Sequence, residues 1–188
     1  MLSLVLSVFI SGEQIIAQET ELNEKEKKKL EKENKKKQKE ASQLADFNKA
    51  KEMAETKSFV FTGSEMFTPD GSAPLNARLN FFYLEGDEAT LQFAFEGLQF
   101  IPNPNGLGGI TSKGKVTKYT FKADNPKKPV SIQVTVQPMA GQGSGIHQVV
   151  LTIYGDGYAE LLLQSSNVRV KGSIVKPEDS KIYEGTQM

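Results

Sequence analysis

The clearest pattern in the sequence is an alternation of apolar and polar positions on both sides of a turn near residue 155. Gly155-Asp156-Gly157 is a typical turn sequence. Every second residue is apolar before and after it, at Val149, Leu151, Ile153, Ala159, Leu161 and Leu163. A period of two around a Gly/Asp turn predicts a β-hairpin with one buried face on each strand.

The same alternation continues through most of residues 58–176. We expect these residues to point inward: Phe59, Phe61, Leu75, Ala77, Leu79, Phe81, Tyr83, Leu91, Phe93, Phe95, Thr117, Tyr119, Phe121, Ile132, Val134, Val136, Val168, Val170 and Ile174. Short turns join most of the resulting segments. About eight strands with one apolar face each predict a mainly β domain over 58–176, an antiparallel barrel. A two-sheet β-sandwich has the same strand pattern and is the alternative.

Residues 18–57 have a different pattern, which predicts a long charged α-helix before the barrel. From residue 19 on they contain no Gly or Pro, and Lys, Glu, Ala and Leu dominate. Pairs such as Glu31 and Lys35 lie four residues apart, and each stabilises a helix by roughly 0.2–0.5 kcal/mol. No apolar residue occurs between Glu31 and Glu40, which disfavours a coiled-coil seam there. We therefore expect a solvated helical spacer.

The end of this helix differs from its beginning. Apolar residues recur there at helical spacing, at Leu44, Phe47, Ala50, Met53 and Ala54. We expect this stripe to pack against the following domain, across one end of it.

The first residues form an apolar run, from Leu2 to Ile10, that is shorter than the about 20 residues a membrane-spanning helix needs. Ala17 is a small residue of the kind that precedes a signal-peptide cleavage point. Two features differ from a typical signal peptide: no Lys or Arg precedes the apolar run, and Ile15 stands where a small residue is usual. We interpret residues 1–17 as a signal peptide and expect export to the periplasm or cell envelope, without a stable membrane span after cleavage. An uncleaved anchor is the alternative. Residues 177–188 are expected to form a C-terminal tail.

Composition narrows the chemistry. The 23 basic and 23 acidic residues cancel, so no net charge favours nucleic acid as a partner. The chain has no Cys, which excludes disulfides and thiolate zinc sites, and its single His cannot build a histidine metal site. We therefore expect no metal and no cofactor.

Three features bear on catalysis. The segment 109–116 approaches a phosphate-binding loop, but Val116 stands where Ser or Thr is needed and a strand pattern follows. His147 is expected at the inward rim of the core, and no Gly-x-Ser-x-Gly motif accompanies it. Carboxylates occur at expected turns and ends, at Asp70, Glu85, Asp87, Asp156 and Asp179. A hydrolase that uses these carboxylates or His147 is therefore the alternative to a non-enzymatic protein.

Two loops are longer than a turn requires. Residues 101–109 are rich in Pro, Asn and Gly, and residues 137–145 are rich in Gly. Long loops on a rigid scaffold often carry binding sites, but they also tolerate insertions.

The chain resembles a family of secreted bacterial domains of unknown function numbered 4251, over about residues 49–176. The resemblance rests on short motifs: Phe59-Val60-Phe61, Gly86-Asp87 followed by residues 91–97, Gly108-Gly109-Ile110, Gly157-Tyr158-Ala159, and residues 165–172. It implies export and a lipocalin-like barrel. It implies no activity and no functional residues, and the long charged helix lies outside it.

Together these observations predict an exported, non-enzymatic barrel, expected to be a monomer, that binds a small apolar ligand or a cell-envelope protein. A ligand cavity would be lined by aromatic residues of the barrel interior. The candidate ligand-binding residues are Phe93, Phe95, Phe121 and His147.

Overall fold

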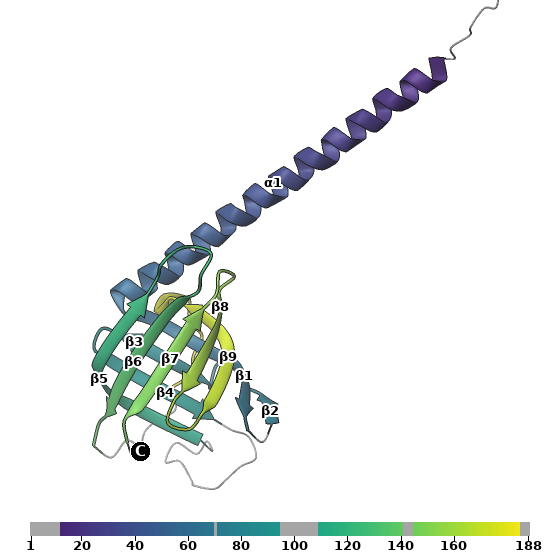
Figure 1. Cartoon of the computed structure of the whole chain (residues 1–188). Coiled ribbons are helices and arrows are strands. Elements are labelled where there is room, and N and C mark those ends of the chain that lie inside the picture. Colours follow the sequence, from purple (N-terminus) through teal and green to yellow (C-terminus); the bar gives the residue numbers. More distant parts are fainter. Residues whose placement is uncertain (1–11, 70, 95–108, 141–144, 185–188) are drawn as a thin grey trace, which may run out of the picture. The chain divides into compact units, whose positions relative to one another are not determined.

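The computed structural model describes residues 12–69, 71–94, 109–140 and 145–184 (Figure 1). The chain divides into two compact units, residues 1–41 and 42–188. One helix, α1 (Gly12–Thr56), provides the described part of the first unit and the start of the second. All side chains of residues 26–41 are exposed, as expected for a charged helix. Within the described residues, no helix combines the length and apolar character needed to cross a membrane.

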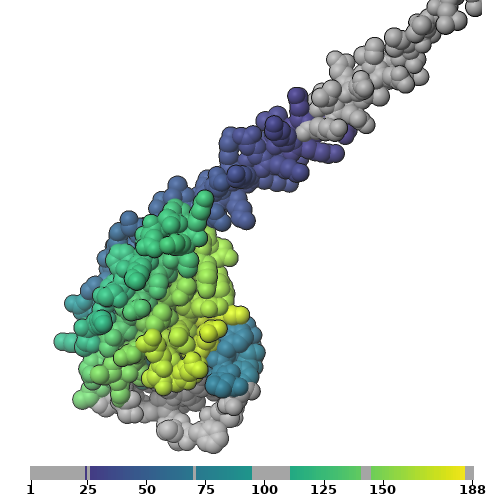
Figure 2. Space-filling view, viewed as in Figure 1, coloured from purple at the N-terminus to yellow at the C-terminus, as the bar shows by residue number. Residues whose placement is uncertain are grey.

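The second unit is a closed antiparallel barrel. Its strands are β1 (Ser58–Thr68), β2 (Gly71–Pro74), β3 (Phe81–Glu85), β4 (Glu88–Ala94), β5 (Gly109–Lys122), β6 (Val130–Pro138), β7 (His147–Ile153), β8 (Tyr158–Leu163) and β9 (Val168–Val175). They follow the order β2-β1-β3-β4-β5-β6-β7-β8-β9, and pairing of β1 with β9 closes the ring. Eight strands form the barrel, and β2 adds to the end of β1. The barrel prediction is therefore confirmed and the sandwich alternative is wrong. Strands β5 to β9 face the viewer in Figure 2, with the β1–β2 hairpin beside β9.

The hairpin that dominates the sequence pattern forms as predicted. Leu151 of β7 pairs with Leu161 of β8, and both side chains are fully buried. Glu160, which precedes Leu161 in β8, pairs with Thr152 and Lys171 on the outer face. Alternation therefore gave the correct register for this part of the barrel.

The last turns of α1 belong to the barrel core. Phe47, Ala50, Met53 and Ala54 are buried in one cluster with the inward residues of the strands. This confirms the predicted apolar stripe at four of its five positions. Leu44 is the exception, because 47% of its surface is exposed.

Strand β3 corrects the predicted register. Residues 75–80 form no strand, because the Asn80 side chain donates to the carbonyl of Asn76 at 2.9 Å and holds a turn. The inward side chains of β3 are Phe82 and Leu84, while Phe81 lies on the outer face. The prediction that Leu75, Ala77, Leu79, Phe81 and Tyr83 share an inward face is therefore wrong.

A second correction concerns β5. The pairing of β5 with β6 shifts between Val116 and Lys118, so Thr117 is an extra residue in the strand. Thr117 is exposed, and Tyr119 and Phe121 pack against the core. Thr117 therefore does not share their inward face, contrary to the prediction.

The C-terminal segment covers part of the outer surface of the barrel. A short 3-10 helix, η1 (Pro177–Asp179), lies against β1. Tyr183, later in this segment, is tied to β4. The side-chain amide of Gln92 donates 3.0 Å hydrogen bonds to the carbonyls of Leu79 and Tyr183. Gln92 pairs with Phe81, and both outward side chains are buried. Residues 177–184 are thus a packed part of the domain.

Candidate functional site

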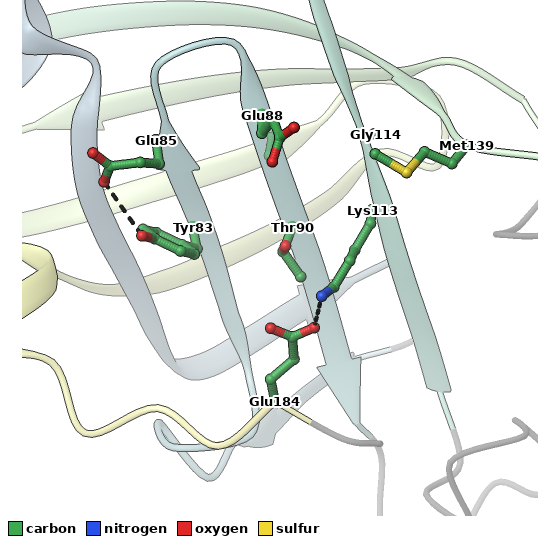
Figure 3. A pocket seen from close by; sticks show the side chains of 9 residues that line it. Tyr83, Glu85, Glu88, Thr90, Lys113, Gly114, Met139 and Glu184 are labelled. Atoms are coloured by element: carbon green, nitrogen blue, oxygen red, sulfur yellow. Dashed lines mark hydrogen bonds and ion pairs between the residues drawn. The ribbon is translucent and has the colours of Figure 1, made fainter. Parts of the chain in front are cut away.

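The outer face of β3, β4 and β5 carries a groove that is lined by described residues. It encloses about 230 Å³ and is lined by Tyr83, Glu85, Glu88, Ala89, Thr90, Lys113, Gly114, Met139 and Glu184 (Figure 3). Three strands supply its floor, the segment after β6 supplies Met139, and the C-terminal segment supplies Glu184. The site therefore depends on three separate parts of the sequence.

The β3–β4 hairpin carries two carboxylates of the groove. Glu85 and Glu88 are register partners on either side of the tight turn. Glu85 accepts hydrogen bonds from the hydroxyl of Ser58 at 2.9 Å and from the hydroxyl of Tyr83 at 3.3 Å. Burial, followed by the negative charge of Glu85, raises the pKa of Tyr83. Tyr83 therefore stays a neutral hydrogen-bond donor beside a fixed carboxylate.

The opposite side of the groove contains an ion pair between Lys113 and Glu184 (Figure 3). This pair connects β5 to the C-terminal segment. Met139 lies next to Gly114 of β5, with 41% of its surface exposed (Figure 3). With three glutamates and one lysine, the ionisable carboxylate and ammonium groups of the lining carry an excess of negative charge.

The residues predicted to bind a ligand do not gather in this groove. Phe93 is buried near the end of β4, whereas Phe121 lies near the end of β5, at the opposite end of the barrel. Phe121 contacts the ring of Tyr119, with the ring centroids 6.4 Å apart. Phe95 lies outside the described residues. Within the barrel, Phe93 and Phe121 therefore form separate parts of the packed core.

His147 lies at the start of β7 and points inward, as predicted. Its Nε2 is 3.0 Å from the hydroxyl oxygen of Ser112, which has no exposed surface. Burial lowers the pKa of His147, so the neutral imidazole is favoured. The distance suits a nucleophile and its base, but a nucleophile must also reach its substrate. In this arrangement the pair satisfies two polar groups inside the barrel.

The turn carboxylates lie in different places. Asp87 forms a 3.0 Å ion pair with Lys57, and Asp156 accepts a hydrogen bond from the backbone of Tyr158. Asp179 lies in η1, and Asp70 lies outside the described residues. Of the five predicted carboxylates, the groove contains Glu85.

A comparison with protein families decides the membership of the chain. Residues 40–171 match the family described as "Domain of unknown function (DUF4251)". The chain belongs to this family. The DUF4251 region includes the last turns of α1 and most of the barrel, and residues 12–39 of the helix precede it.

A solved structure shows the same fold. It is a crystal structure of a DUF4251 family protein from Bacteroides eggerthii DSM 20697, with 22% sequence identity and a TM-score of 0.58. The similarity covers 79% of this DUF4251 chain and 99% of the other. A comparison with curated proteins gave no match.

Sequence reasoning found only one member of the groove, Glu85. Thr90 and Lys113 face each other across β4 and β5, but their separation along the chain hides this. Glu184 lies in a segment that was expected to be a tail. The outward polar positions of β3 to β5 carry no motif, so the sequence alone gives no signal for the site.

Proposed function

We propose that this DUF4251 chain is an exported, non-enzymatic binding module that contacts a cell-envelope protein through the groove on β3, β4 and β5. The apolar run and Ala17 near the N-terminus support export. The observation that carries the proposal is the contrast between a packed interior and a concave polar exterior.

The packed interior favours a protein partner over an apolar ligand. The core cluster extends from Met53 of α1, at one end of the barrel, to Phe93 near the other. Large aromatic side chains, including Phe59, Phe61 and Phe82, are fully buried in the core cluster inside the barrel. A carrier of an apolar ligand needs a cavity of about 300 Å³ or more at the position that these rings fill.

The charge of the groove indicates the kind of side chain it receives. Glu85 is oriented by Ser58 and Tyr83, and Glu88 lies opposite it in the hairpin. Lys113 is engaged by Glu184. A lysine or arginine side chain of the partner fits this excess of carboxylate, and complementary charge contributes to specificity and association rate.

The proposed absence of catalysis rests on the environment of the best nucleophile candidate. Ser112 lies 3.0 Å from His147 but has no exposed surface. A substrate carbonyl must approach a serine to within about 3–3.5 Å before acyl transfer. The buried hydroxyl supports a structural role for the pair.

Site-specific photo-crosslinking in the native host tests the proposal. A photoreactive amino acid at Met139, in the groove, should give a covalent adduct with one envelope protein. The same amino acid at Gln133, exposed on the outer face of β6, is the matched control. A Glu88→Gln background should weaken the Met139 adduct. Equal adducts from both positions, or none from Met139, would contradict the proposed partner site.

A further inference from the structure

We infer that the first unit of the chain binds the surface of an anionic phospholipid bilayer through one face of α1. The face consists of six lysines: Lys28, Lys29, Lys32, Lys35, Lys36 and Lys39. It lies in residues 26–41, which belong to the first unit of the chain.

The lysines share one side of the helix. Successive residues of an α-helix are turned by about 100°, so these six positions fall within about one third of its circumference. They also span about 17 Å along the helix axis at about 1.5 Å per residue. Every one of these side chains is exposed, and side chains of this segment project separately from the helix (Figure 2). The result is a straight stripe of positive charge.

The acidic residues of the segment lie outside the stripe. Glu24 and Glu40 flank it and contact Lys28 and Lys36 at 3.9 and 4.0 Å. The shortest ion pair of this part of the helix, at 3.0 Å, joins Glu33 to Lys37, which lies off the stripe. Among the described residues, no ion pair involves the remaining lysines of the stripe, Lys29, Lys32, Lys35 and Lys39. The overall charge balance of the chain therefore conceals a local cationic face.

The character of the stripe favours a bilayer surface. Its positions have the spacing at which an amphipathic helix carries apolar residues, but all six are lysine. Residues 31–40 contain no apolar side chain, so the helix does not insert into the acyl region and binds by charge alone. Each lysine held near an anionic surface contributes about 1 kcal/mol of binding, within about one Debye length. A flat, dense array of phosphate headgroups can engage all six ammonium groups at once.

Vesicle co-sedimentation of the whole chain tests this inference. Binding should be stronger to vesicles of phosphatidylcholine with phosphatidylglycerol than to phosphatidylcholine alone, and added salt should reduce it. The double variant Lys32→Gln/Lys35→Gln should lose about 30-fold in affinity for the anionic vesicles, since about 1 kcal/mol per lysine corresponds to that factor. Gln preserves helix propensity, and circular dichroism verifies that the helix persists.

The matched control is Lys27→Gln/Lys37→Gln, which removes the same charge from exposed positions off the stripe. Its affinity for the anionic vesicles should fall by at most about 3-fold, because these side chains point away from the bound surface. Equal losses of affinity in the two double variants would overturn the inferred role of the stripe, because binding would then depend on net charge alone. Equal binding to neutral and anionic vesicles would overturn the inference. Stripe-dependent binding to duplex DNA without binding to anionic vesicles would also overturn it, because the ligand would then be a nucleic acid.

Discussion

The hydroxyl of Tyr119 in β5 donates a 2.6 Å hydrogen bond to the carbonyl oxygen of Ala54 in the last turn of α1. The last four carbonyl groups of a helix receive no hydrogen bond from within the helix. The Tyr119 hydroxyl therefore satisfies a carbonyl that would otherwise be buried without a partner. Tyr119→Phe removes the donor and should lower the free energy of unfolding by about 1–2 kcal/mol. Urea unfolding measures this. Tyr183→Phe, at a side chain 57% exposed, should change it by less than about 0.5 kcal/mol.

The burial of Tyr119 predicts that the free energy of unfolding depends on pH. Burial raises the pKa of Tyr119 to about 12, above its ordinary value of 10.0. Between these values the folded protein binds more protons than the unfolded chain, so the stabilisation is complete below about pH 10 and is lost as pH rises toward 12. The stability of the natural protein should therefore fall more steeply than that of Tyr119→Phe across this window. Parallel curves from urea unfolding would show that the phenol is not held in its neutral form.

The β8 strand offers a matched pair of core and surface leucines. Leu161 is fully buried, and Leu162 lies on the outer face of the same strand with partial exposure. Leu161→Ala should cost about 2–5 kcal/mol of stability, because it leaves a cavity in the packed core. Leu162→Ala should cost clearly less, about 1 kcal/mol or below. Similar shifts of the two unfolding midpoints would contradict the assigned register.

The two parts of α1 should contribute differently to barrel stability. Met53 is 2% exposed, whereas Leu44 is 47% exposed on the same helix. Met53→Ala should cost about 2–5 kcal/mol and Leu44→Ala less than about 0.5 kcal/mol. Deletion of residues 19–40 should leave the unfolding midpoint unchanged, while deletion of residues 19–56 should lower it and expose the core. A large loss from the shorter deletion would mean that residues 19–40 pack against the barrel.

Closure of the barrel depends on a glycine in β9. Gly172 pairs with Gly63 of β1, and a Cβ atom on Gly172 would lie 1.9 Å from the carbonyl oxygen of Thr62. Gly172→Ala forces the two strands apart and should cost roughly 3 kcal/mol. At Gly155 the nearest atom to an added Cβ would be 3.9 Å away, so Gly155→Ala should be nearly neutral. Thermal unfolding of the two variants makes the comparison, and equal melting temperatures would contradict the tight β1–β9 contact.

Alternation in the sequence was sufficient for the fold wherever apolar and polar residues strictly alternate. Val149, Leu151 and Leu161 are buried as predicted, and the eight-stranded barrel follows from many such segments. The pattern failed at Phe81 and Phe82, because two adjacent phenylalanines give no signal for which one points inward. Tertiary packing determines which phenylalanine points inward. Phe82 enters the core, and the C-terminal segment passes over the outer face near Phe81.

The groove was harder to predict than the barrel. Its polar residues occupy outward strand positions, where polar side chains are ordinary and mark no site. Glu85, Lys113 and Glu184 line one groove because of the strand order and the path of the last residues, which alternation does not encode. The aromatic candidates Phe93 and Phe121 carry no signal for this groove: Phe93 belongs to the core cluster and Phe121 packs against it.

A buried core cluster fills the barrel interior, and we propose that a partner binds the outer face instead. Native mass spectrometry of the protein purified from its natural host tests this proposal. We expect the mass of the polypeptide alone or of its complex with a protein partner, and a Glu88→Gln variant should lose that partner. A small apolar molecule retained by the natural protein and by Glu88→Gln alike would contradict binding at the outer face, because it would require a cavity where the core is packed.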